Sequence, residues 1–243
     1  MKVAEPDPAD LAEIDSFCDT LWLEDGLARA SLASYRSDLL QLATWLGEQQ
    51  LGSLCRIDEA TLLRFVATLA QTLRASSQAR YLSTLRRFYR YQLAHGRRSS
   101  DPTLKIAMPA RPSRLPKVIS EAQVERLLAA PQVETMLGQR DRAMLETLYA
   151  TGLRVTELVG LRLHELNLDM GVVRIFGKGG KERLVPLGEE ARDWLRRYLA
   201  DGRPALLEGR QSDDLFVTGR GSAMTRQAFW QLIKRYALQA EMD

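Results

Sequence analysis

The 243-residue sequence has little cysteine and histidine and no long apolar run. Its two cysteines, Cys18 and Cys55, lack a metal-like spacing, so we expect reduced thiols and no disulfide. Neither histidine, His95 or His164, has a ligand partner nearby in sequence, and no acidic cluster suggests a two-metal nuclease. No run is long enough to cross a membrane, and the first residues do not form a signal peptide. These absences predict a cytoplasmic protein that needs neither a metal nor a membrane.

Acidic residues are almost missing from the middle of the chain. Residues 60–118 contain 12 Lys and Arg against one acid, Asp101, whereas residues 1–59 contain 4 against 12. Residues 119–243 are balanced, with 18 of each sign. A basic block of this kind is typical of nucleic-acid binding, although a solvated arginine-rich surface is the alternative.

The first part of the chain has the periodicity of a helical domain. Apolar residues at steps of three and four predict helices over residues 9–24, 31–48, 58–73 and 77–95. Asp58 is a suitable N-cap for the third. Residues 97–118 are basic and rich in proline, which predicts an interdomain linker. This segment is either a free tether or a strap along phosphates, and its charge favours the strap.

The remainder reads as a mixed α+β domain in which helices dominate. Ser120 begins a capping-box-like sequence. Helices are predicted over residues 120–130, 138–150, 154–163, 188–200 and 225–239. A small antiparallel sheet is predicted from strands at 165–169, 172–176, 183–187 and 215–218.

The predicted helix over 77–95 has one apolar stripe and one basic face. The basic face carries Arg80, Ser83, Arg86, Arg87 and Arg90. Such a face fits a DNA major groove, where arginine reaches phosphates and base edges. The alternative is an exposed surface helix, but such helices normally mix charges of both signs.

Two cations in the second domain suit a pentavalent phosphate. Arg154 follows Gly152 at the start of a helix, and Lys178 lies in a glycine-rich hairpin. A guanidinium can grip two non-bridging oxygens while a lysine reaches the leaving oxygen. The alternatives are an i,i+3 pair of Arg154 with Glu157 and a solvated turn at Lys178. The spacing is not that of a phosphate-binding Walker loop.

Several segments together resemble the tyrosine recombinases of the phage-integrase family, of the bacterial Xer type. The resemblance runs from about Ile14 to the end of the chain. Its motifs are Ser34–Leu39, Ala79–Tyr91, Ala150–Leu161, Gly177–Leu187 and Met224–Trp230.

The resemblance implies a mainly α protein of two domains. A helical SAM-like core-binding domain would cover residues 1–96 and bind DNA, the linker would cover 97–118, and an α+β catalytic domain with a small antiparallel sheet would cover 119–243. The family's first catalytic arginine falls on Arg154 and its hairpin lysine on Lys178, with Glu157 in a supporting role. We also expect Arg183 and Arg226 to contact DNA.

The implied reaction cuts and rejoins DNA through a 3′-phosphotyrosyl bond, with no metal and no nucleotide cofactor. The implied setting is the resolution of chromosome dimers at cell division. The partners would be a double-stranded recombination site, a second Xer recombinase in a heterotetramer, and a septal DNA translocase.

The sequence has no histidine after Lys178, and Tyr236 lies outside the family's tyrosine context. We therefore expect the catalytic domain to be truncated at its C-terminal end, the nucleophile to be missing, and this chain to be inactive alone. The alternative function is a catalytically silent DNA-binding protein that occupies a recombination site or pairs with a full-length partner.

Overall fold

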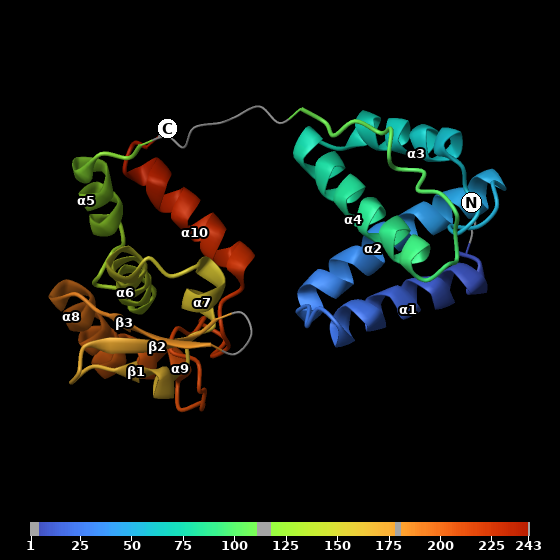
Figure 1. Cartoon of the computed structure of the whole chain (residues 1–243). Helices are drawn as coiled ribbons and strands as arrows, with labels where there is room; N and C mark the ends of the chain where they lie inside the picture. The colour runs from blue at the N-terminus through green and yellow to red at the C-terminus, as the bar shows by residue number, and fades with distance from the viewer. Residues whose placement is uncertain (1–4, 111–117, 178–180, 243) are drawn as a thin grey trace. The chain divides into compact units, whose positions relative to one another are not determined.

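The computed structural model describes residues 5–110, 118–177 and 181–242. The chain divides into two compact units, Met1–Leu115 and Pro116–Asp243, which are described separately below. Figure 1 shows the helices of the first unit in blue to green and the mixed second unit in green to red.

The described residues of the first unit form four helices around one apolar core. The helices are α1 (Pro8–Leu23), α2 (Arg29–Gln49), α3 (Glu59–Thr72) and α4 (Ala75–Ala94). Asp58 accepts a hydrogen bond from the Thr61 N–H at 2.8 Å, which confirms it as the N-cap of α3. The largest core side chains include Phe17, Phe65 and Phe88. The predicted helical bundle is therefore confirmed, with helix ends shifted by a few residues.

The described part of the predicted linker packs on this bundle. Ile106 is buried in the core of the first unit, and Thr103, three positions earlier, is also buried. The Arg98 guanidinium donates hydrogen bonds of 2.7 Å to the carbonyls of Cys55 and Ile57. Residues 97–110 therefore belong to the packing of the first unit, because Ile106 enters its core and Arg98 binds its backbone, whereas Leu104 and Met108 stay exposed.

The second unit combines helices with a small sheet. Its described helices are α5 (Glu121–Ala129), α6 (Met136–Thr151), α7 (Val155–Val159), α8 (Glu189–Arg197), α9 (Arg203–Leu207) and α10 (Arg226–Gln239). Ser120 and Gln123 form the predicted capping box of α5. Strands β1 (Leu166–Asn167), β2 (Val172–Phe176) and β3 (Glu182–Pro186) pair antiparallel in that order. The mainly helical fold class with a small antiparallel sheet is confirmed.

Two predicted elements of the second unit differ from the structure. The helix predicted over 154–163 ends at Val159, with Gly160 as its C-cap, and the strand predicted over 215–218 is reduced to isolated bridges. Both differences have one cause. Leu161 and Leu163 leave the helix and exchange backbone hydrogen bonds with residues 213–215, a pairing across some fifty positions of sequence.

The core of the second unit lies between the sheet and the helices, and Val173, Tyr198, Phe216 and Phe229 are fully buried in it. Helix α6 contacts α7, α8 and α9, while α10 contacts α5 and α7. Among the described residues, none of the helices has the length and apolar content that a membrane crossing requires.

Candidate nucleic-acid interface and catalytic site

Arg154 is presented to solvent by the turn that joins α6 to α7. Helix α6 ends at Gly152, whose φ of 60° lies in the left-handed region that glycine adopts without strain. Leu153 is buried in the core, and the next residue, Arg154, is the N-cap of α7 with a side chain that is 77% exposed. The chain is therefore anchored on one side of the arginine by Leu153, and the guanidinium points outward.

Glu157 connects this arginine to the sheet. Its carboxylate accepts hydrogen bonds from the Arg154 backbone N–H at 2.8 Å and from the Arg154 side chain at 3.1 Å. It also accepts a hydrogen bond from the Arg183 guanidinium of β3 at 2.9 Å. The i,i+3 pair that was the alternative interpretation of Arg154 is thus formed, and the same carboxylate also brings two predicted site arginines together.

These contacts set the protonation of Glu157. Burial raises the pKa of its carboxyl, but the hydrogen bonds from Arg154 and Arg183 and the charge of Arg183 outweigh burial, so the pKa lies below its usual 4.5. A carboxyl with a lowered folded pKa contributes stability above its unfolded pKa, and this contribution is lost as the pH falls through the folded pKa. The Glu157 carboxyl is therefore charged at neutral pH.

We expect the Glu157 side-chain carboxyl to titrate below 4.5 in a carbon-detected NMR experiment. Arg183→Ala should raise that midpoint, because it removes one charged donor. Arg196→Ala should leave it unchanged, since Arg196 pairs with Asp193. A midpoint that Arg183→Ala does not move would contradict the bridging role of Glu157.

Lys178, the second predicted catalytic cation, lies outside the described residues. The strands that flank it are in register up to the pair of Phe176 with Glu182, and the Gly177 N–H donates to the Lys181 carbonyl at 2.7 Å. Arg226 is the first residue of α10 and is exposed, and α10 contacts α7. Arg154, Arg183 and Arg226 thus all belong to the second unit.

The candidate DNA-binding residues of α4 form an outward stripe that Arg86 flanks. Arg80, Ser83, Arg87 and Arg90 follow steps of three and four and form one outward stripe, which we call the α4 stripe. Arg86 flanks this stripe, three positions after Ser83 and four before Arg90; it is half-buried, as Arg87 is, and donates to the Ile106 carbonyl at 2.8 Å. This contact holds the segment after α4, and the predicted DNA contact of Arg86 stays a prediction.

Acids from the first helices neutralise part of the basic block. Four ion pairs join residues 1–59 to residues 60–118: Glu13–Arg97, Asp25–Arg87, Asp38–Arg80 and Glu59–Lys105. The separation of charge along the sequence is therefore in part cancelled in space. Within the described residues, Arg90 makes no ion pair, which leaves its charge available at the surface.

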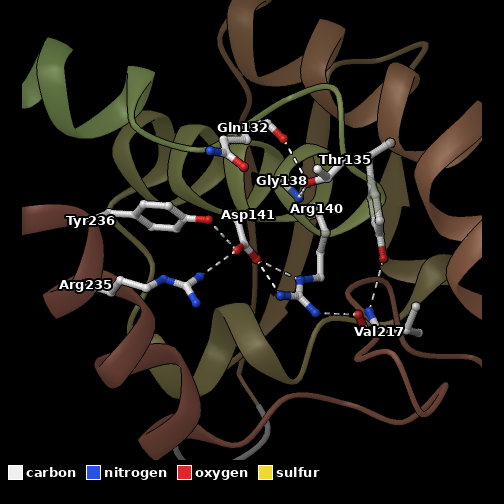
Figure 2. Close-up of polar contacts among 9 residues, drawn as sticks. Gln132, Thr135, Gly138, Arg140, Asp141, Val217, Arg235 and Tyr236 are labelled. Carbon is white, nitrogen blue, oxygen red and sulfur yellow. Dashed lines mark hydrogen bonds and ion pairs between the residues drawn. The ribbon is translucent and has the colours of Figure 1, made fainter. Parts of the chain in front are cut away.

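A buried polar centre around Asp141 was not predicted from the sequence. Figure 2 shows the Asp141 carboxylate between Arg140 of α6 and the side chains of Arg235 and Tyr236 from α10. Asp141 accepts two hydrogen bonds from Arg140 at 2.6 and 2.8 Å and one from the Tyr236 hydroxyl at 2.7 Å. Burial and the Asp141 carboxylate raise the pKa of Tyr236 to about 12. The phenol is therefore a protonated hydrogen-bond donor at neutral pH.

A metal site is not built from the described part of the chain. Among residues 5–110, 118–177 and 181–242, no three His, Cys, Asp or Glu side chains come together as ligands. Cys18 and Cys55 are free thiols.

Comparison with known proteins defines the class of protein. The model of the phage integrase N-terminal SAM-like domain matches residues 14–96, and that of the phage integrase family matches residues 117–243. The chain belongs to the phage integrase family and is a site-specific recombinase of the tyrosine type.

The relatives narrow this class further. The tyrosine recombinase XerD of Ralstonia nicotianae is 51% identical, over 97% of this chain and 76% of its own length. The tyrosine recombinase XerD of Pseudomonas aeruginosa is 54% identical, over 92% of this chain and 75% of its own length. Within the family, the chain is therefore of the XerD type.

Solved structures agree in fold. A XerH site-specific recombinase bound to a palindromic difH substrate matches with a TM-score of 0.70 and 20% identity, over 96% of this chain and 68% of that chain. A lambda integrase tetramer bound to a Holliday junction gives a TM-score of 0.70 at 15% identity, over 96% and 64%. At these identities the likeness establishes the fold alone.

Proposed function

We propose that this protein binds a double-stranded recombination site and takes part in cutting and rejoining it through a 3′-phosphotyrosyl intermediate. The observation that carries the proposal is the 51% identity to a XerD recombinase over 97% of the chain. The XerH and lambda integrase structures that share the fold were solved with DNA, which supports the choice of ligand.

In this proposal, Arg154 grips the non-bridging oxygens of the scissile phosphate and Lys178 protonates the departing 5′ oxygen. The 77% exposure of the Arg154 side chain supports the first role, since a large ligand can reach its guanidinium while Glu157 holds its backbone N–H and one guanidinium nitrogen. A preorganised cation stabilises the charge that develops on the phosphate in the transition state. Arg183 and Arg226 would add contacts to neighbouring phosphates.

The proposed organisation places DNA binding in residues 1–96, a linker at 97–118 and the catalytic domain at 119–243. The proposed setting is the cytoplasm, where XerD-type proteins would resolve chromosome dimers at cell division. There the partners would be a second Xer recombinase in a heterotetramer and a septal DNA translocase. The relatives named XerD support this setting.

A second candidate function, a catalytically silent DNA-binding protein, is favoured by the environment of Tyr236. Its phenol is buried and bonded to Asp141, and its raised pKa of about 12 opposes formation of the phenolate. Among the other described tyrosines of the second unit, Tyr198 is fully buried and Tyr149 is exposed. Tyr236 is therefore a poor nucleophile for a phosphodiester.

A nicked duplex that traps covalent intermediates separates the two functions. With the recombination site of the Pseudomonas aeruginosa XerD, we expect no protein–DNA adduct from residues 1–243 alone. We expect an adduct from a chimera in which these residues are joined to the remaining C-terminal part of that XerD. In the chimera, Arg154→Ala should slow adduct formation about a hundredfold, the typical loss for one transition-state donor.

An adduct from residues 1–243 that peptide mapping locates on Tyr236 or Tyr149 would overturn the expectation of inactivity. Tyr149→Phe and Tyr236→Phe are the matched controls for that outcome. A chimera that binds the site but forms no adduct would instead contradict the recombinase proposal.

A further inference from the structure

Two arginines of the α4 stripe are paired with acids, and the two pairs differ in burial. The Arg80 guanidinium meets the Asp38 carboxylate of α2 at 2.5 Å. The Arg87 guanidinium meets Asp25, which lies between α1 and α2, at 2.7 Å. The two acids therefore pair with arginines of the same stripe, but Asp38 is buried and Asp25 is exposed.

Asp38 is fixed inside the protein. Its side chain is 4% exposed, and the carboxylate oxygen that binds Arg80 also accepts a hydrogen bond from the buried Thr84 hydroxyl at 2.8 Å. A carboxylate in this position cannot turn toward water without breaking both contacts, and it is poorly screened. It therefore holds one edge of the Arg80 guanidinium at a set place.

The other side of Arg80 faces solvent. Its side chain is 52% exposed and lines an open cavity of about 330 Å³ between α2 and α4, together with Ala33, Ser34, Ser37 and Asp38 itself. The Arg80 guanidinium also lies 5.3 Å from the centre of the Tyr81 ring. The guanidinium is therefore held on its inner side and open on its outer side, where a phosphate oxygen can approach.

Asp25 has the opposite character. Its side chain is 48% exposed, and the Arg87 side chain that it meets is also held by the Tyr35 hydroxyl at 3.2 Å and packs on the Tyr35 ring. Arg87 would thus keep its place without the acid. An exposed ion pair of this kind is weak, and a phosphate must compete with Asp25 for the same guanidinium.

We infer that Asp38 is a positioning residue that presents Arg80 to a DNA phosphate in the cavity between α2 and α4, whereas Asp25 competes with DNA for Arg87. The inference rests on the proposed function, because it takes the α4 stripe as a DNA-contacting surface. It assigns opposite effects on binding to two acids of the same charge.

The test compares Asp38→Asn with Asp25→Asn in duplex binding by fluorescence anisotropy, with the whole chain and a fluorescein-labelled duplex. Electrostatics alone predicts that both variants bind more tightly, since each removes one negative charge. We expect Asp25→Asn to tighten binding about two- to fivefold, as for the loss of one exposed ion pair. We expect Asp38→Asn to weaken binding about tenfold, as for the loss of one charge-assisted hydrogen bond.

A double-mutant cycle separates positioning from a general loss of structure. If Asp38 acts through Arg80, the variant Asp38→Asn with Arg80→Ala should bind no more weakly than Arg80→Ala alone. Additive losses, or tighter binding by Asp38→Asn, would overturn the positioning role. Weaker binding by Asp25→Asn would overturn the competition. Thermal melting of each variant identifies an assay temperature at which all the variants are folded, so that the binding constants can be compared.

Arg90→Ala shows whether the proposed surface itself is right. Arg90 lies on the same stripe, is exposed, and has no ion pair with the described residues. If Arg90→Ala leaves duplex binding unchanged, the α4 stripe is not the DNA surface and the inference fails with it. If Arg90→Ala weakens binding while Asp38→Asn tightens it, the inference fails and the DNA surface stands.

Discussion

Duplex DNA affinity should fall about 10³-fold when the salt concentration rises from about 50 to about 200 mM. Six arginines are proposed to meet phosphates: Arg80, Arg87 and Arg90 in the first unit and Arg154, Arg183 and Arg226 in the second. Each neutralised phosphate releases counterions and contributes about −0.9 to the slope of log affinity against log salt, so the slope should be about −5. Fluorescence anisotropy titrations at one temperature and several salt concentrations measure this slope.

Single variants should change that slope in a predictable way. Arg90→Ala removes a stripe arginine that forms no ion pair within the described residues. The slope should therefore become less steep by about 0.9, the contribution of one phosphate. Arg196→Ala is the matched control, because Arg196 pairs with Asp193 on α8. Affinity that does not depend on salt, or an equal change of slope in both variants, would refute an electrostatic interface on the α4 stripe.

Local signals in the sequence predicted the elements that form locally. Asp58 and Ser120 mark helix starts because each side chain accepts a hydrogen bond from the backbone N–H three positions later. Both caps are formed in the structure. Gly152 separates α6 from α7, which places Arg154 next to its partner Glu157. Each of these contacts is decided within one helical turn, so the sequence window contains all the groups involved.

Contacts across long separations in sequence could not be predicted in this way. Asp38 and Arg80 are 42 positions apart, and Asp25 and Arg87 are 62 apart. The basic helix therefore looked free of acids in sequence, although two of its arginines form ion pairs with acids in space. The early end of α7 has the same origin, because Leu161 pairs with Leu215. Binary patterns and caps carry no information on such partners.

The Asp141 centre is the most distant of these contacts, and its loss should be costly. Tyr236 and Asp141 are 95 positions apart. Asp141 is 1% exposed and Arg140 is also buried, so Asp141→Ala leaves a buried guanidinium without its counter-charge. Removing one partner of a buried ion pair costs about 3–5 kcal/mol. The free energy of unfolding of the second unit should fall by about that amount.

Urea unfolding followed by the fluorescence of Trp194 and Trp230 measures this loss, in a background where Trp22 and Trp45 of the first unit are replaced by Phe. Asp193→Ala is the control, since it breaks an exposed pair with Arg196 and should cost less than about 1 kcal/mol.

Tyr236→Phe should fall between these two variants, because it removes one hydrogen bond to a charged group, about 1.5–3 kcal/mol, and keeps the Arg140 pair. If Asp141→Ala unfolds at the same urea concentration as Asp193→Ala, the buried centre does not fasten α10 to α6. If instead Tyr236→Phe costs as much as Asp141→Ala, the phenol contact carries the link and the Arg140 pair contributes little.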